Sequence, residues 1–229
     1  MIVLSMSTSS PRGTVAIARD SRILARVAYD GGTSHAERLF AVIDEAMAHA
    51  GITRAEIDAL ACDIGPGSFT GVRVGVASAK GIAVALSIPV VGVGSLESMA
   101  HAAASIAAGR DVIAVVDARK GEVFAGAYDT ALRPTWGPRH LGRDQASTLG
   151  DLAIERAALV VGAVVTELSG LAPPPRAADL DLPDASSIAL LAILRLAGLT
   201  SVEARMRFDA ALLEATYVRA PDARPMPTA

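Results

Sequence analysis

Runs of apolar residues with the spacing of β-strands open the chain. Residues 2–6 are continuously apolar, residues 14–18 are small or β-branched, and residues 22–29 have an alternating pattern. Pro11, Arg12 and Gly13 supply turn chemistry between the first two runs. The first thirty residues therefore predict three short strands.

Helical spacing follows this strand-rich opening. Leu39, Ile43, Ala46, Met47 and Ala50 fall on one face of a helix that Ser34 would cap and Gly51 would end. Strands and helices then alternate, in the predicted order of a strand at 59–64, a loop at 65–71, a helix to about 86, a strand at 89–93 and a helix capped by Ser95 to about 108.

The opening plan repeats near the middle of the chain. A run over 111–117, a turn at 119–121 and a run over 123–128 match the first two strands and their turn. We interpret this as an internal duplication that divides the chain into lobes at 1–109 and 110–229, the second smaller and with a frayed, Pro-rich tail. Chance similarity of two apolar hairpins is the alternative.

The second half carries weaker patterns. Residues 159–165 predict a strand, and the three prolines at 173–175 indicate a loop. Ser187 would cap a helix that runs to about residue 199 and is apolar almost all round. Such a helix is expected to be buried between other elements.

Composition and charge exclude several classes of protein. Of the 229 residues, 52% are hydrophobic and 20% are charged, which is unlike an extended disordered chain. The net charge is −3, so binding to nucleic acid through bulk charge is not expected. Only 3% of residues are aromatic, too few for a broad base-stacking surface.

The same composition points to a reducing, cytoplasmic setting. Cys62 is the single cysteine, so an internal disulfide and any multi-cysteine metal site are excluded. The N-terminus has no positive flank typical of a signal peptide. The apolar stretch at 72–93 is interrupted by Arg73, Lys80 and Pro89, and we do not expect it to span a membrane.

The loop at 65–71 is the most distinctive local pattern. It joins a strand to a helix, so free backbone N–H groups could hold an anion, although a tight turn that needs glycine explains the same residues. It lacks the Lys and Ser/Thr of a Walker loop. Beyond it, Gly71, Gly75 and Ala79 recur every four residues and would let another helix approach closely, from this chain or from another.

The sequence gives little support for a catalytic role of any side chain. Ser68 lacks the Gly-x-Ser-x-Gly context, and no pair of the four histidines has metal-ligand spacing. Asp117 and Glu122 flank the second turn and could hold a divalent ion, but a turn ion pair with Arg119 or Lys120 also explains them.

Four segments together resemble the bacterial TsaB (YeaZ) family. They are GPGSFTGVRVG at 65–75, PVVGV at 89–93, DARKGEV at 117–123 and LEATYVR at 213–219. The resemblance implies an α/β fold of two RNase H-like lobes of the actin/Hsp70 (ASKHA) superfamily, with mixed sheets flanked by helices. It also implies a role in forming threonylcarbamoyladenosine beside the anticodon of ANN-decoding tRNAs.

Departures from the catalytic relative TsaD imply an accessory role. That relative carries a metal-binding His-x-x-x-His where this chain has Ser95 and Met99. In related phosphotransferases an aspartate ends the first strand, and this chain has Ser7 at that position. We therefore expect no catalytic residue, no metal and no cofactor. Weak nucleotide or anion binding would involve Gly65, Gly67, Ser68, Asp117 and Glu122.

The resemblance also implies partners. A TsaD-like catalytic subunit and a TsaE-like ATPase are expected, with homodimerisation when the chain is alone and without direct contact to tRNA or membrane. The expected interface lies on two helices and comprises His35, Leu39, Val42, Ile43, Gly71, Val72, Gly75 and Ala79. The main alternative is an active small-molecule kinase or ATPase of the same superfamily; a peptidase would lack both a metal pair and a triad.

Overall fold

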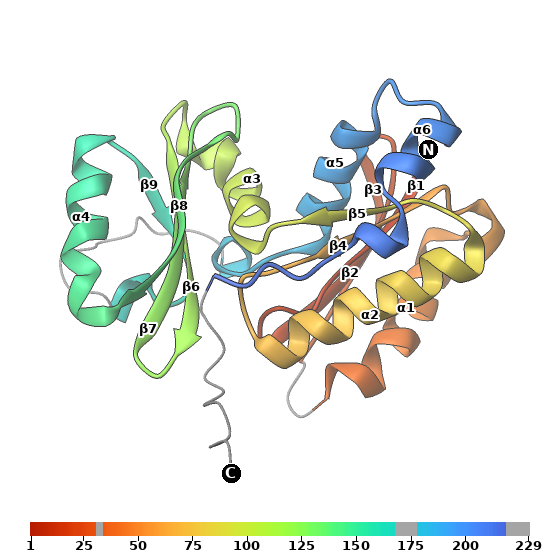
Figure 1. Ribbon diagram of the computed structural model, residues 1–229, viewed down its shortest axis with the longest axis horizontal. Coiled ribbons are helices and arrows are strands. Elements are labelled where there is room, and N and C mark those ends of the chain that lie inside the picture. The colour runs from red at the N-terminus through yellow and green to blue at the C-terminus, as the bar shows by residue number, and fades with distance from the viewer. Residues whose placement is uncertain (31–33, 168–177, 219–229) are drawn as a thin grey trace, which may run out of the picture.

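Two mixed β-sheets with helices on their faces make up the protein, which we describe from a computed structural model (Figure 1). The structure describes residues 1–30, 34–167 and 178–218, so the proline run at 173–175 and the predicted fraying tail after 218 lie outside it. The strands are β1 (Ile2–Ser7), β2 (Arg12–Arg19), β3 (Arg22–Asp30), β4 (Ala59–Asp63), β5 (Val90–Val93), β6 (Val112–Arg119), β7 (Glu122–Tyr128), β8 (Pro134–Gly142) and β9 (Leu159–Val161). The main helices are α1 (His35–Ala50), α2 (Phe69–Leu86), α3 (Ser95–Ala107), α4 (Ala146–Glu155), α5 (Ala185–Leu196) and α6 (Ser201–Arg207).

The first sheet has the order β3-β2-β1-β4-β5. Strands β1, β2 and β3 pair antiparallel, while β4 is parallel to both β1 and β5. Every residue of β1 and β4 is buried, which agrees with the continuous apolar runs and with a sheet covered on both faces. The three predicted N-terminal strands are confirmed.

The second sheet repeats this plan in the order β8-β7-β6-β9. Strand β6 pairs antiparallel with β7 and parallel with β9, as β1 pairs with β2 and β4. This equivalence supports the duplication inferred from the two hairpins. The sequence analysis did not predict β8, because its two prolines and two glycines are residue types that are depleted in strands and they interrupt any alternating pattern.

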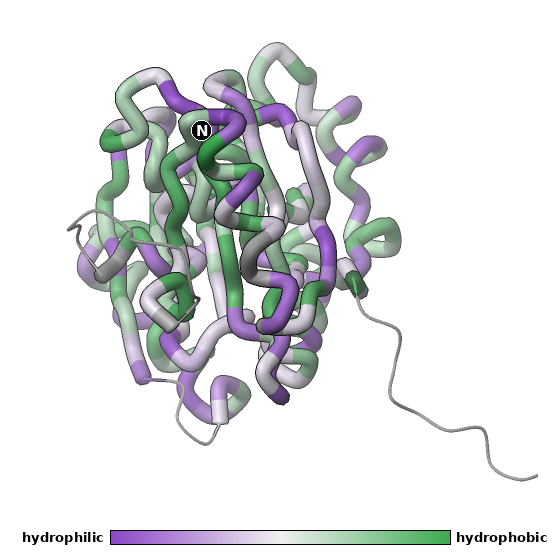
Figure 2. Tube along the Cα trace, turned by 90° about the vertical axis from the view of Figure 1, so that its left-hand side faces the viewer, coloured by the Kyte–Doolittle hydropathy of each residue, from purple (hydrophilic) through white to green (hydrophobic). Residues whose placement is uncertain are grey.

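Helices cover both faces of the first sheet. One face carries α1 and α2, whose buried side chains form a core with Leu4, Met6 and Leu60 of the strands. The other face carries α5, and Ile188 and Ala192 of that helix pack against β1 and β4. In Figure 2, hydrophobic stretches follow the strands through the molecule, and hydrophilic residues concentrate at turns and outer helices. The predicted burial of α5 is confirmed.

Two predicted helix starts are corrected by the structure. Helix α5 is capped by Asp184, whose side chain accepts a hydrogen bond from the Ser186 amide at 2.9 Å, and not by Ser187, which lies inside the first turn. Helix α3 begins at Ser95 with Gly94 as its N-cap, because the Ser95 hydroxyl is bonded elsewhere. Ser34 caps α1 as predicted.

Packing between the two sheets crosses residue 110 twice. Helix α3, which precedes that position, packs on the second sheet through Leu96 and Met99. Helix α5, which follows it, packs on the first sheet. The two helices are joined by Arg195, which reaches both carboxylate oxygens of Glu97 at 2.6 and 2.7 Å. The division between residues 109 and 110 stays a prediction. Each of these two helices packs on the sheet of the other half of the chain.

Helix α2 is long and apolar enough by length and composition to cross a membrane, and a bent pair of segments at 185–196 and 201–212 also meets that criterion if taken as one span. Core helices of water-soluble proteins meet the same criterion. In α2, Val72, Val76 and Ala83 pack into the core beneath the first sheet, so part of its apolar character belongs to the fold.

Candidate functional site

A fully buried carboxylate lies at the carboxyl end of β4. The Ser7 and Ser9 hydroxyls donate to Oδ2 of Asp63 at 2.7 and 2.5 Å. The Ser95 hydroxyl and the Gly65 amide donate to Oδ1 at 2.5 and 2.9 Å. These donors come from the end of β1, the segment after it, the loop after β4 and the start of α3. A single side chain therefore ties together four segments where the two lobes meet.

The protonation of Asp63 is set by two opposing effects. Burial raises its pKa above the usual value, and the four hydrogen bonds lower it, with burial the larger effect. Each carboxylate oxygen already accepts two hydrogen bonds, so its acceptor positions are occupied. Within the described residues, no group of three His, Cys, Asp or Glu side chains could hold a metal ion. Asp63 is thus a structural acceptor and a poor metal ligand.

Sequence reasoning missed this residue. Asp63 ends the apolar run Ala-Leu-Ala-Cys, and an acidic side chain at the end of a buried strand was a signal that could have been used. Ser7, noted as a replacement for an aspartate, is one of its donors. The predicted buried, structural character of Cys62 is supported, because its thiol is fully buried and burial raises its pKa.

The glycines of the 65–71 loop are required by close packing. A Cβ at Gly67 would lie 2.4 Å from the Ser9 carbonyl oxygen. A Cβ at Gly71 would lie 2.0 Å from the Thr8 carbonyl oxygen. Ser68 caps α2, its Oγ accepting from the Gly71 amide at 3.2 Å. These contacts support the tight-turn interpretation of the loop.

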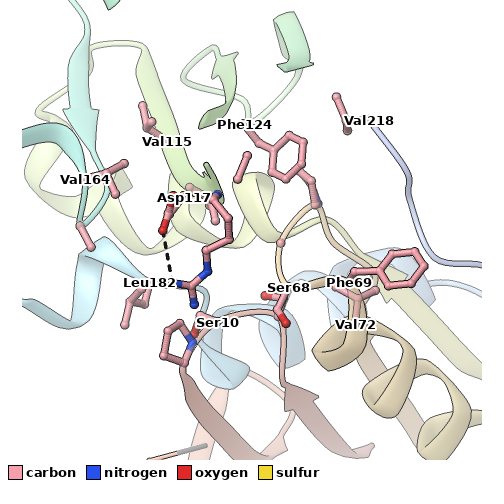
Figure 3. A pocket seen from close by; sticks show the side chains of 18 of the residues that line it. Ser10, Ser68, Phe69, Val72, Val115, Asp117, Phe124, Val164, Leu182 and Val218 are labelled. Atoms are coloured by element: carbon pink, nitrogen blue, oxygen red, sulfur yellow. Dashed lines mark hydrogen bonds and ion pairs between the residues drawn. The ribbon is translucent and has the colours of Figure 1, made fainter. Parts of the chain in front are cut away.

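A cavity of about 880 Å³ opens between the two lobes (Figure 3). Of the residues predicted to bind an anion, Gly67, Ser68 and Asp117 line it. Most of its other walls are apolar, and they include Val72, Val115, Phe124, Val164, Leu182 and Val218. The tertiary structure therefore brings the first-lobe loop and the second-lobe turn to one cleft, as the prediction required.

Two members of the predicted anion site lie elsewhere. Gly65 does not line the cavity, because it is buried beside Asp63 with its carbonyl accepting from the Ser95 amide at 2.8 Å. Glu122 also lies outside it and faces His140 of the neighbouring strand, with 2.8 Å between the carboxylate and Nε2. Gly65 therefore turns inward and Glu122 pairs across β7 and β8, and a role for either in anion binding stays a prediction.

Asp117 is paired with Arg119 within its own turn. Its Oδ1 accepts from the Arg119 amide at 2.9 Å, and its Oδ2 lies 3.6 Å from the Arg119 guanidinium (Figure 3). This is the turn ion pair that the sequence left open as an alternative. A carboxylate already paired in this way attracts a metal–phosphate group less strongly.

Seven of the eight predicted interface residues are buried in this chain's own fold. Leu39, Val42 and Ile43 pack in the core of the first lobe, together with Val72 and Ala79. The two glycines of the stripe are also buried. These helix faces cover the chain's own sheet, so the contact of these residues with a partner stays a prediction.

Local contacts account for Gly75, one of the seven buried residues, and for His35, the eighth. A Cβ at Gly75 would lie 2.5 Å from the hydroxyl oxygen of buried Thr8, so the small stripe serves intramolecular packing. His35 is partly exposed, and its two ring nitrogens lie 3.2 Å from the Tyr29 hydroxyl and 3.0 Å from the Ser10 carbonyl oxygen. His35 therefore anchors the start of α1.

The outward faces of the same helices carry large apolar side chains. Phe40 of α1 is 53% exposed, and Phe69 and Val84 of α2 are 51% and 69% exposed. Sequence reasoning missed them because it followed the stripe of small residues. The sequence carried a usable signal, since each helix also has large apolar residues on the face opposite its buried side chains.

Comparison with known proteins connects this geometry to a family. The sequence profile of tRNA N6-adenosine threonylcarbamoyltransferase, TsaD, matches residues 26–137. The chain is 31% identical to the tRNA threonylcarbamoyladenosine biosynthesis protein TsaB of Escherichia coli, over 74% of this chain and 72% of that protein. It is 43% identical to the TsaB protein of Haemophilus influenzae over 40% of this chain, an alignment that spans only 39% of that relative.

Solved structures show the same architecture. YeaZ from Pseudomonas aeruginosa superposes with a TM-score of 0.76 at 28% identity, over 94% of this chain and 99% of that one. The (R)-2-hydroxyglutaryl-CoA dehydratase component A of Acidaminococcus fermentans, at 13% identity and a TM-score of 0.52, shares the fold alone. The expected α/β fold, with two mixed sheets flanked by helices, is confirmed.

Removing the buried carboxylate charge should change how stability depends on pH. Because burial raises the pKa of Asp63, ionising this group costs more in the folded protein than in the unfolded chain, so the free energy of unfolding falls as pH rises above about 4. Urea unfolding from about pH 4 to pH 8 should show that this fall is shallower in Asp63→Asn. Asp44→Asn, which alters an exposed pair with Arg54, is the control. Parallel slopes for the wild type and Asp63→Asn would contradict this assignment.

Arginine substitutions at two positions on α2 should show which face of the helix is packed and which is exposed. Gly75→Arg forces a long side chain against Thr8 and should cost more than about 4 kcal/mol of folding stability. Ala77→Arg lies on the exposed face and should change stability by no more than about 0.5 kcal/mol. Urea denaturation measures both, and equal stability of the two variants would show that the glycine stripe is not packed inside.

Proposed function

The chain belongs to the TsaB family of tRNA threonylcarbamoyladenosine biosynthesis proteins, and from this premise we propose that it is a non-catalytic subunit. It binds and supports a TsaD-like catalytic subunit, in a complex that also includes a TsaE-like ATPase. The complex forms threonylcarbamoyladenosine beside the anticodon of ANN-decoding tRNAs.

One observation carries the non-catalytic assignment. The two positions at which the resemblance places the metal-binding histidines of TsaD are Ser95 and Met99, and both are completely buried. Ser95 donates to Asp63, and Met99 lies in the apolar core against the second sheet. A hydroxyl already committed to a carboxylate and a thioether in a core cannot replace two imidazoles.

We place the docking surface on the outward faces of α1 and α2. Phe40, Phe69 and Val84 expose apolar surface there, which is the kind of patch that a partner covers. The same surface would pair with a second copy when the catalytic subunit is absent. Direct tRNA binding is not part of the proposal, since the chain carries a net charge of −3.

Nucleotide binding in the cleft is proposed to be weak. The cavity is large enough for a nucleotide, and Asp117 and Asp181 both line it. Asp117 is paired with Arg119, Oδ1 of Asp181 accepts from the Gly162 amide at 2.7 Å, and the enclosed Asp63 cannot assist a metal. The kinase or ATPase alternative needs this cleft to hold a metal–triphosphate group.

Reconstitution tests the proposed function directly. Purified alone, the chain should neither modify tRNA nor hydrolyse ATP, and tRNA modification should require it once a TsaD-like subunit, a TsaE-like ATPase and the threonylcarbamoyl adenylate are present. Ala77→Arg should retain its fold but weaken the complex, because it places a long side chain where the apolar surface of the partner would pack against the helix. Modification by this chain unaided, or full activity without it, would refute the proposal.

Calorimetry tests the nucleotide site. Titration with magnesium-ATP should give a Kd no tighter than about 1 mM, which corresponds to about −4 kcal/mol. Asp117→Asn should leave this value unchanged, since the carboxylate is held by Arg119. Tight binding that Asp117→Asn abolishes would favour the kinase or ATPase alternative.

A further inference from the structure

The charge of α2 differs from that of the molecule. The helix has 18 residues, and its only charged side chains are Arg73 and Lys80, both positive. The chain as a whole carries a net charge of −3. Only 33% of this apolar helix is buried, so its outward face presents apolar surface with a local positive charge. A partner surface that combines apolar and acidic groups would complement it.

Arg73 is held in one orientation on this face. Its guanidinium carbon lies 3.7 Å from the ring centroid of Phe69, one turn earlier in the helix. Its Nε donates to the Tyr217 hydroxyl at 3.0 Å, and the two aromatic rings lie 5.8 Å apart. Phe69 and Tyr217 are 51% and 54% exposed, and both line the cavity together with Arg73, so the three side chains form an ordered cluster at its edge.

This arrangement leaves one part of Arg73 available. The Nε is used by Tyr217 and one planar face is covered by Phe69. The two terminal nitrogens have no hydrogen-bond partner within the described ranges of the chain. An arginine oriented by stacking presents its terminal N–H groups as a planar fork, which matches a carboxylate with two parallel hydrogen bonds. Because the side chain is already ordered, less entropy is lost when it binds.

We propose that Arg73, positioned by Phe69 and Tyr217, is the anchor of the docking surface and binds a carboxylate of the catalytic partner subunit. This inference rests on the proposed function. The aromatic rings around it add exposed apolar area of the type that is enriched with arginine at interface hot spots. A stacked RNA base is a poorer occupant, since the guanidinium already covers one face of the Phe69 ring.

Affinity measurements with the purified TsaD-like subunit of the same organism test this assignment. Arg73→Ala should weaken the complex at least about 30-fold, as expected for a hot-spot residue. Arg73→Lys keeps the charge but loses the planar fork, and it should weaken binding about tenfold. Tyr217→Phe removes only the orienting hydroxyl and should give a smaller loss.

Arg139→Ala is the matched control. Its guanidinium lies 4.9 Å from the Trp136 ring on β8 of the second lobe, so it is another exposed, ring-stacked arginine away from α2. This variant should bind the partner like the wild type. Thermal unfolding should show that all four variants are folded, because each altered side chain is exposed.

The outcomes separate this inference from the proposed function. If the wild type binds the catalytic subunit but Arg73→Ala and Arg73→Lys bind equally well, the anchor is wrong while the function stands. If the wild type does not bind, both fail. If Arg73→Ala keeps full affinity for the partner but lowers retention of tRNA by the complex, the fork binds RNA phosphate and the inference is overturned.

Discussion

Hydrogen bonds to a single buried carboxylate hold the start of α3, the helix that packs on the second sheet, against the first sheet. Asp63 receives donors from the end of β1, the segment after it, the loop after β4 and the start of α3. Each of these donors would be left unsatisfied in the interior if the carboxylate were lost, and such groups are costly to bury. The positions of the 65–71 loop, the start of α2 and the α3 helix all depend on this cluster. The shape of the cleft and of the docking surface follows from them.

The same cluster shows how a fold shared with enzymes can be put to a structural use. The carboxyl ends of parallel strands are where α/β folds place their functional side chains. Here the acidic group at that position is surrounded by serine hydroxyls, and Ser95 takes a position that the resemblance assigns to a metal ligand. Polar side chains that could have bound an ion are instead bonded to one another. Fold therefore does not decide activity, and the contacts of individual residues do.

Helix α2 has one packed face and one exposed face, and the proposed docking surface includes the exposed face. The face with Gly75 and Ala79 lies close to the sheet, where any larger side chain at Gly75 would meet Thr8. The opposite face bears Phe69, Arg73 and Val84 and remains open. Burial of the first face fixes the helix rigidly to the lobe, which keeps the second face in a defined orientation for a partner. The cation–aromatic cluster with Tyr217 adds order at the end of the helix nearest the cleft.

The sequence by itself determined the strand and helix plan, the duplication of the β1–β2 hairpin as β6–β7, the capping of α1 by Ser34 and the burial of α5. These features depend on local periodicity and turn chemistry, which neighbouring residues carry. Periodicity also showed that one face of α2 is packed, but it could not show whether its cover is the chain's own sheet or another molecule. Only the tertiary structure decided that, and only it brought residues 7, 9, 65 and 95 to Asp63 and turned Glu122 toward His140. The reason is physical: such contacts are made between segments far apart in the chain, and their partners are set by strand order and crossovers that no local pattern encodes.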